Sequence, residues 1–138
     1  ERAAEAGVKR VDKHELFSTS DVVTLHLILS ERSRHIVDAT ALAAMKPSAY
    51  LVNTSRAGLV DQDALMDALV KFRIAGAGLD VYAEEPLSPT DNVRDLDNVI
   101  LTPHLGYVSR ENFEAFYRNA LDAVKAWHAG QPVRVLNA

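Results

Sequence analysis

The sequence predicts an α/β fold built on a parallel sheet with helices on its faces. Short apolar segments alternate with stretches of helical periodicity, which is typical of β-α-β units. The strand candidates are apolar nearly throughout rather than alternating, as expected where both faces of a sheet are covered. With 138 residues, the chain is long enough for one domain with a substantial core.

The first third of the chain is predicted to contain several short elements. They are, in order, a helix over 1–6, a weak strand over 9–11, one helical turn over 14–18 and a strong strand over 21–29. Gly7 is a suitable residue to end the first helix. Asp38 or Thr40 can cap a short helix that runs through Met45, and Pro47 ends it.

The rest of the chain predicts three further strands, over 49–53, 74–81 and 98–101. Asp61 caps a helix over 62–72, in which apolar residues recur at a spacing of three or four. An irregular acidic loop with two prolines follows the strand over 74–81. Ser109 caps a long amphipathic helix over 110–129, which ends at a Gly and a Pro.

The composition argues against several classes of protein. A net charge of -4 and a pI of about 5.7 are unsuited to a nucleic-acid or anionic-membrane surface. The absence of cysteine rules out a disulfide framework and fits a cytoplasmic location. The longest apolar stretch, 22–29, is too short to cross a bilayer. No paired histidines lie at metal-binding spacing on a predicted helix, so we expect no metal site.

Polar groups follow three predicted strands at the point where each one ends. Arg56 follows the strand over 49–53, Asp80 lies at the end of the next strand with Glu85 beyond it, and His104 comes after the last. Ligands of open parallel sheets bind beyond the carboxyl ends of the strands, and neighbouring strands are about 4.8 Å apart. We therefore expect an arginine, a carboxylate and a histidine to converge on one small molecule.

Each of these residue types has a chemical role and a simpler alternative. The Arg56 guanidinium can hold a carboxylate through two hydrogen bonds and polarise a nearby carbonyl; the alternative is a surface arginine before a helix. His104 can donate or accept a proton near neutral pH; the alternative is a histidine satisfied by the backbone. Asp80, Glu84 and Glu85 compete as the carboxylate that would favour a charged imidazole, and periodicity does not choose between them.

A glycine pair in the predicted strand over 74–81 resembles the start of a nucleotide-binding turn. Gly76-Ala77-Gly78 fails that pattern, because position 81 is Val and the segment enters a strand instead of opening a helix. Close packing of backbones is the better interpretation.

At these residues the chain resembles the D-isomer-specific 2-hydroxyacid dehydrogenases. The motifs that match keep their order and spacing along about residues 15 to 130. They are Asp21-Val22-Val23-Thr24-Leu25-His26-Leu27, Met45-Lys46-Pro47, Leu51-Val52-Asn53-Thr54-Ser55-Arg56-Ala57-Gly58-Leu59-Val60-Asp61, Ala77-Gly78-Leu79-Asp80-Val81-Tyr82-Ala83-Glu84-Glu85-Pro86-Leu87 and Leu101-Thr102-Pro103-His104-Leu105-Gly106.

The resemblance implies a partial Rossmann-like, doubly wound parallel sheet and transfer of a hydride between NAD(P)H and a 2-oxo or D-2-hydroxy acid. Arg56 would anchor the substrate carboxylate. His104 would be the catalytic acid and base, paired with a glutamate. Because the family's glutamate directly precedes the proline, the resemblance selects Glu85.

The same resemblance implies a site for NAD or NADP. Asp80 would contact the nicotinamide carboxamide, and Thr54, Ser55, His104 and Gly106 would line the cofactor. The sequence does not distinguish NAD from NADP or identify the 2-hydroxy acid. Family members are usually homodimers when full length, with no nucleic-acid or membrane partner.

Several features depart from the family pattern. Ile28 stands where many members have Pro, and Tyr107 stands where a small residue is common and would shape the substrate pocket. The family's Gly-x-Gly-x-x-Gly turn is expected upstream of Glu1. We therefore expect 1–130, with its closing helix, to be the C-terminal portion of the NAD(P)-binding domain, and 131–138 to be a tail returning toward a substrate domain.

The resemblance has two consequences for the chain and leaves two alternatives. A strand over 9–11 would lack a neighbour in such a piece, and the chain alone would be inactive and bind NAD weakly. A non-catalytic, dinucleotide-sensing corepressor of the same fold is the main alternative. A formate dehydrogenase is disfavoured, because those enzymes have Gln where Glu85 stands.

Overall fold

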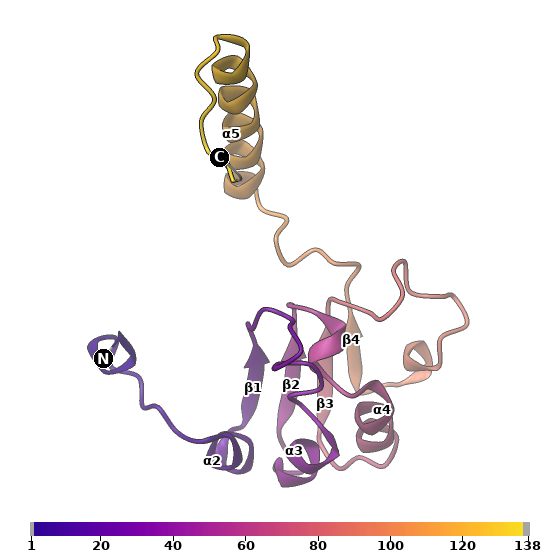
Figure 1. Ribbon diagram of the computed structural model, residues 1–138. Helices are drawn as coiled ribbons and strands as arrows, with labels where there is room; N and C mark the ends of the chain where they lie inside the picture. The colour runs from indigo at the N-terminus through magenta and orange to yellow at the C-terminus, as the bar shows by residue number, and fades with distance from the viewer. Residues whose placement is uncertain (1, 137–138) are drawn as a thin grey trace. The chain divides into compact units, whose positions relative to one another are not determined.

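The computed structural model describes residues 2–136, and the chain divides into two compact units, Glu1–His104 and Leu105–Ala138 (Figure 1). The division falls directly after His104. Each unit is described by itself.

The first unit contains one sheet of four parallel strands in the order β1-β2-β3-β4. The strands are β1 (Val22–Leu25), β2 (Tyr50–Asn53), β3 (Gly76–Leu79) and β4 (Val99–Leu101). All three pairings are parallel. The predicted α/β class is therefore confirmed, although the strands are shorter than the apolar segments that predicted them.

Three helices pack on one face of this sheet: α2 (Lys13–Thr19), α3 (Ala39–Ala44) and α4 (Gln62–Val70) (Figure 1). Each is preceded by an aspartate whose side chain accepts a backbone N–H of the first turn. Of the two candidate caps for α3, the structure has Asp38. Between this face and the helices lies the core, whose fully buried side chains include Leu51, Leu59, Leu69 and Ile74.

The opposite face of the sheet is exposed within this unit. Val22, Tyr50 and Ile100 are 58%, 51% and 74% exposed, whereas Val23 and Leu51 on the helix side are buried and Val99 and Leu101 are partly buried. The expectation that both faces are covered thus holds for one face only among the described residues of this unit. Apolar strands show that both faces are suited to burial, but not which segment covers them.

Other local expectations were wrong or incomplete. No strand forms over 9–11, where the chain is irregular and mostly exposed; a strand needs a hydrogen-bonded neighbour, and none of the four strands pairs with this segment. The predicted turn over 14–18 is the longer helix α2. Two single-turn 3₁₀ helices, η1 (Ala57–Leu59) and η2 (Asn92–Asp95), were not anticipated.

The N-terminal helix α1 (Arg2–Glu5) ends before Gly7, which has φ +69 as a helix-ending glycine should. The predicted helix also included Glu1, which lies outside the described residues.

Gly76 allows β3 and β4 to approach closely. A Cβ atom placed there would lie 2.3 Å from the carbonyl oxygen of Asn98, whereas at Gly78 the nearest atom would be 3.8 Å away. Gly76 therefore serves strand packing, as the failed nucleotide pattern suggested, whereas Gly78 has room for a side chain.

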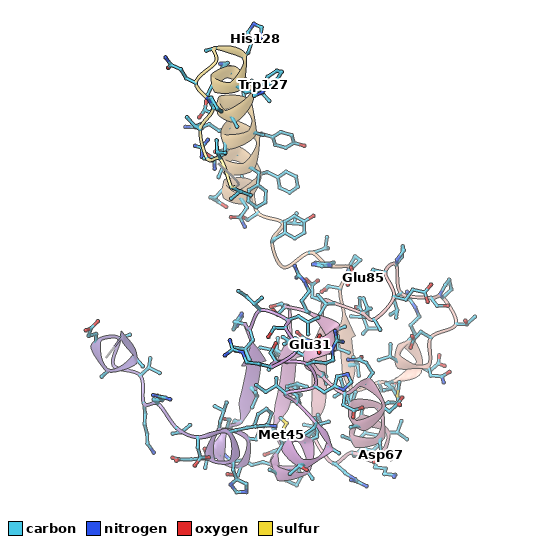
Figure 2. The ribbon with its side chains drawn as sticks, in the orientation of Figure 1. Glu31, Met45, Asp67, Glu85, Trp127 and His128 are labelled. Carbon is cyan, nitrogen blue, oxygen red and sulfur yellow. The ribbon has the colours of Figure 1, made fainter. Side chains whose placement is uncertain are left out.

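The second unit is built on α5 (Arg110–His128), which Ser109 caps through the N–H of Asn112 at 3.2 Å. Its apolar side chains, including Phe116 and Trp127, are exposed. Figure 2 shows Trp127 and His128 at the C-terminal end of this helix. None of the helices between residues 2 and 136 is long and apolar enough to cross a membrane.

Candidate active site

An ion pair joins the segments that follow β3 and β4. The Nδ1 atom of His104 lies 2.7 Å from Oε2 of Glu85, a distance typical of a charge-assisted hydrogen bond. Both side chains are 37% exposed, so the pair is open to a ligand. Glu85 lies beyond the carboxyl ends of the strands (Figure 2). The imidazole thus contacts the carboxylate through Nδ1, one of its two proton-exchanging nitrogens.

The backbone holds this pair from both sides. The N–H of Tyr82 donates to Oε1 of Glu85 at 3.0 Å. His104 follows Pro103 and has φ +56, a left-handed conformation that is uncommon for a residue other than glycine. Its N–H donates to the carbonyl of Thr102 at 3.1 Å. The direction of the imidazole is therefore set by a tight turn at the end of β4.

Three interactions lower the pKa of Glu85 below its usual range. The largest is the hydrogen bond from His104, followed by the N–H of Tyr82, with a smaller contribution from the positive charge of Arg56. Of the predicted trio, the structure brings Glu85 and His104 into contact. Arg56 follows β2, the neighbour of β3 in the sheet.

The side chain of Tyr82 links the ends of β3 and β4 next to the Glu85–His104 pair. Its hydroxyl lies 2.9 Å from the carbonyl oxygen of Leu79 and 2.8 Å from that of Thr102, so its proton is shared between the two acceptors. Partial burial raises the pKa of this phenol, which keeps it neutral. Tyr82 was not among the site residues predicted from the sequence, although its position between Asp80 and Glu85 could have indicated that it lies near the site.

Asp80 occupies a different position from Glu85. It is only 3% exposed, and the hydroxyl of Thr102 donates to its Oδ1 at 2.5 Å. Its N–H donates to the carbonyl of Asn53 on β2 at 3.0 Å. The structure thus separates the competing carboxylates: Glu85 pairs with His104, Asp80 is buried between strand ends, and Glu84 is exposed.

The segment after β2 carries Thr54, Ser55 and Arg56. Thr54 and Arg56 are exposed, and the Ser55 hydroxyl donates to the carbonyl of Leu27 at 2.7 Å. One of the five N–H groups of Arg56 donates to the carbonyl of Ser55 at 2.6 Å. The predicted cofactor residue Gly106 belongs to the second unit and is not part of this geometry.

A cleft of about 560 Å³ adjoins the ion pair, within the size range of small-molecule sites. Tyr82, Glu85, Thr102 and His104 line it, together with Arg94. Arg94 also donates to the carbonyls of Leu87 and Ser88, which holds the loop between β3 and η2.

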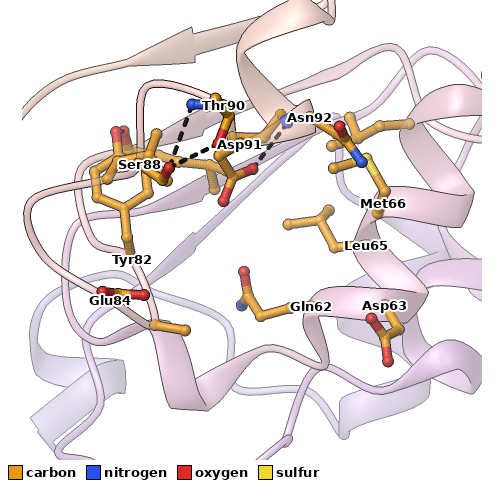
Figure 3. Close-up of a pocket in the computed structure, with 15 residues that line it drawn as sticks. Gln62, Asp63, Leu65, Met66, Tyr82, Glu84, Ser88, Thr90, Asp91 and Asn92 are labelled. Carbon is orange, nitrogen blue, oxygen red and sulfur yellow. Dashed lines mark hydrogen bonds between the residues drawn. The ribbon is translucent and has the colours of Figure 1, made fainter.

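A second cleft of about 490 Å³ lies between α4 and the loop after β3 (Figure 3). Apolar side chains that line this cleft include Leu65 and Leu79, and acidic side chains that line it are Asp63, Glu84 and Asp91. It includes neither Glu85 nor His104, which both line the first cleft, and Arg56 lines neither of the two.

The residues present fit the nicotinamide end of NAD or NADP. Asp80 offers a buried carboxylate at the end of β3, the type of acceptor that a carboxamide N–H needs. Among residues 2–136, the Gly-Ala-Gly segment lies inside β3 and does not open a helix, so it provides no pyrophosphate cradle. His, Cys, Asp and Glu side chains within the described ranges form no group that could hold a metal ion.

Comparisons with known proteins give one consistent result. The family profile described as D-isomer specific 2-hydroxyacid dehydrogenase, NAD binding domain, matches residues 1–106. A glycerate dehydrogenase of Methylorubrum extorquens is 42% identical over 132 residues, which are 93% of this chain and 41% of that enzyme.

Solved structures agree. The structure of D-lactate dehydrogenase from Escherichia coli matches with a TM-score of 0.86 and 32% identity, over 96% of this chain and 41% of that one. An acyclic imino acid reductase in complex with NADPH and D-Arg matches with a TM-score of 0.81 and 34% identity, over 95% and 42% of the two chains. The chain thus spans about two fifths of the length of these relatives.

Proposed function

Because the chain belongs to the D-isomer specific 2-hydroxyacid dehydrogenases and matches their NAD-binding domain, we propose that it forms the catalytic edge of an NAD- or NADP-dependent dehydrogenase. Its substrate would be a small 2-oxo acid or the corresponding D-2-hydroxy acid. The observation that carries the proposal is the 2.7 Å contact between His104 and Glu85.

Each residue of the trio has a defined task in the reductive direction. Arg56 binds the substrate carboxylate and orients the adjacent keto group through its planar, bidentate guanidinium. The imidazolium of His104, held through Nδ1 by Glu85, gives the proton on Nε2 to the keto oxygen. A bound NADH or NADPH supplies the hydride to the keto carbon. In the oxidative direction His104 takes the hydroxyl proton.

The cofactor side of the proposal uses neighbouring residues. Asp80 accepts from the nicotinamide carboxamide, and Thr54, Ser55, His104 and Gly106 line the same dinucleotide. The stereochemical choice among substrates is left to residues that this edge does not supply. This division fits the relatives, whose names include a glycerate dehydrogenase and a D-lactate dehydrogenase.

We extend the proposal to the organisation of the whole enzyme. Residues 1–130 would form the C-terminal portion of the NAD(P)-binding domain, and 131–138 would lead toward a substrate domain. A homodimer in the cytoplasm, with no nucleic-acid or membrane partner, is part of the same proposal. Sedimentation of the whole enzyme would check the assembly.

The test of the proposed function is turnover by the whole enzyme that carries this chain. Reduction of glyoxylate or hydroxypyruvate with NADH or NADPH is expected, and Arg56→Ala should abolish most of it. Arg73→Ala is the matched control, because Arg73 pairs with Asp67 away from the site and its loss should leave turnover unchanged. Dinucleotide binding without turnover of any 2-oxo acid would instead favour a dinucleotide sensor.

A further inference from the structure

We propose that Asn53 is a positioning residue that fixes the segment of Arg56 for substrate binding, which deepens the proposed function and rests on it. Asn53 is the last residue of β2 and is only 1% exposed. A carboxamide buried this deeply must make its hydrogen bonds inside the protein. The partners that it uses all belong to the proposed site.

The side chain of Asn53 bridges the turn that carries the arginine. Its Nδ2 donates to the carbonyl oxygen of Arg56 at 3.0 Å, and its Oδ1 accepts the N–H of Ser55 at 3.1 Å. The carbonyl of Arg56 also accepts the N–H of Leu59, and this bond closes the single turn of η1. One carboxamide thus links both ends of the exposed turn to the buried end of the strand.

The backbone of Asn53 connects the same residue to the cofactor side. Its carbonyl accepts the N–H of Asp80 from the adjacent strand at 3.0 Å. This bond does not involve the side chain, so replacing the carboxamide leaves it in place. The side chain therefore acts on Arg56 and the backbone on Asp80, which makes the two effects separable by mutation.

The expected consequence is a selective loss of substrate binding. An arginine that makes equal contacts in the ground and transition states contributes to KM more than to kcat. Without the carboxamide, the Arg56 turn should sample several conformations, each of which must be ordered on binding. Asn53 touches neither substrate nor cofactor, so the acid–base chemistry of His104 should be unaffected.

The first experiment compares Asn53→Ala with Asn98→Ala in the whole enzyme. Asn98 is a matched control, because its Nδ2 also donates to a backbone carbonyl, that of Leu69, directly before β4. We expect Asn53→Ala to raise KM for the 2-oxo acid by about ten-fold. The affinity for the dinucleotide and the pH profile of kcat should stay as in the unmodified enzyme, and Asn98→Ala should alter none of these.

A purely structural role would give a different pattern. Asn53→Ala would then lower the melting temperature without a selective change in KM, and that result would overturn the inference. A loss of kcat with an altered pH profile would also overturn it. If the unmodified enzyme reduces no 2-oxo acid, the proposed function fails. The role of the Asn53 side chain in holding the Arg56 turn is then tested separately, by amide hydrogen exchange.

The second experiment needs no variant and serves if Asn53→Ala does not fold. Amide hydrogen exchange of the 138-residue chain reports on the N–H of Ser55, which the bridge protects. We expect exchange at least about ten-fold slower than for an unstructured peptide. Exchange at the unstructured rate would show that the carboxamide does not hold the turn.

Discussion

The Nδ1 atom of His104 lies 2.7 Å from Oε2 of Glu85, although 19 positions separate the two residues in the chain. They meet because β3 and β4 are adjacent and parallel, so the segments that follow them emerge side by side. The contact occupies Nδ1, one of the two ring nitrogens through which an imidazole can exchange a proton. Both the proton transfer by His104 and the acidity of Glu85 depend on this contact.

His104→Gln should remove the proton donor while keeping a polar side chain. Loss of a positioned acid and base lowers turnover by about 10²- to 10⁴-fold. The substitution should affect dinucleotide affinity far less, because His104 is only one of several residues proposed to line the cofactor. Steady-state kinetics of the whole enzyme and a dinucleotide titration would check this. A decrease in turnover of less than about ten-fold would contradict the role assigned to His104.

The Glu85–His104 pair should make stability depend on pH on the acidic side. Since the folded state lowers the pKa of Glu85, this carboxylate stabilises the fold above its unfolded pKa of about 4.3. That contribution is lost as the pH falls from there through the lower folded value. Because the side chain is partly exposed, we expect less than about 1 kcal/mol.

Thermal melting of the chain and of Glu85→Gln, followed between neutral and acidic pH, would measure this contribution. The difference between the two melting curves should shrink as Glu85 becomes protonated. A difference that grows toward low pH would have the wrong sign for a carboxylate with a lowered pKa.

How much of this could be predicted from sequence depended on whether a feature is local. The caps Asp61 and Ser109 were predicted correctly, because a cap bonds to N–H groups within its own first turn. A strand over 9–11 was predicted incorrectly, because strand formation depends on a distant neighbour. A contact between a carboxylate after β3 and the histidine after β4 could be expected, since strand order alone brings these two segments together.

The carboxylate that pairs with His104 could not be identified from residue spacing alone. Spacing could not decide between Asp80 and Glu85, because the path of the loop after β3 determines which one reaches His104. The family resemblance selected Glu85, and the structure places that residue against the imidazole. Asn53 was overlooked for a related reason: its partners are backbone atoms, which leave no pattern in side-chain types.

Asp61→Ala should destabilise the first unit through α4. The Asp61 side chain accepts the N–H of Ala64 at 3.1 Å, and loss of such a cap costs about 1 kcal/mol. Asp63→Ala is the matched control, because it removes the same charge from the same helical turn without removing the cap bond. Chemical denaturation of both variants would check this, and equal losses would mean that charge, rather than capping, stabilises the helix start.

Gly76→Ala should separate β3 from β4 and disturb the site at the end of β4. The added Cβ would meet the carbonyl oxygen of Asn98 at 2.3 Å, and this backbone atom can move only together with its strand. Overpacking of this kind costs about 1–3 kcal/mol.

Gly78→Ala, two residues along the same strand, places its Cβ no closer than 3.8 Å to any atom. That substitution should be nearly neutral, or slightly stabilising because alanine restricts the unfolded chain. Denaturation curves of the pair measure the cost of the contact. The Tyr82 N–H, which donates to Glu85, reports in an NMR spectrum whether the shift of β4 reaches the ion pair. Equal stability of the two variants would show that the strands are not packed at van der Waals contact beside Gly76.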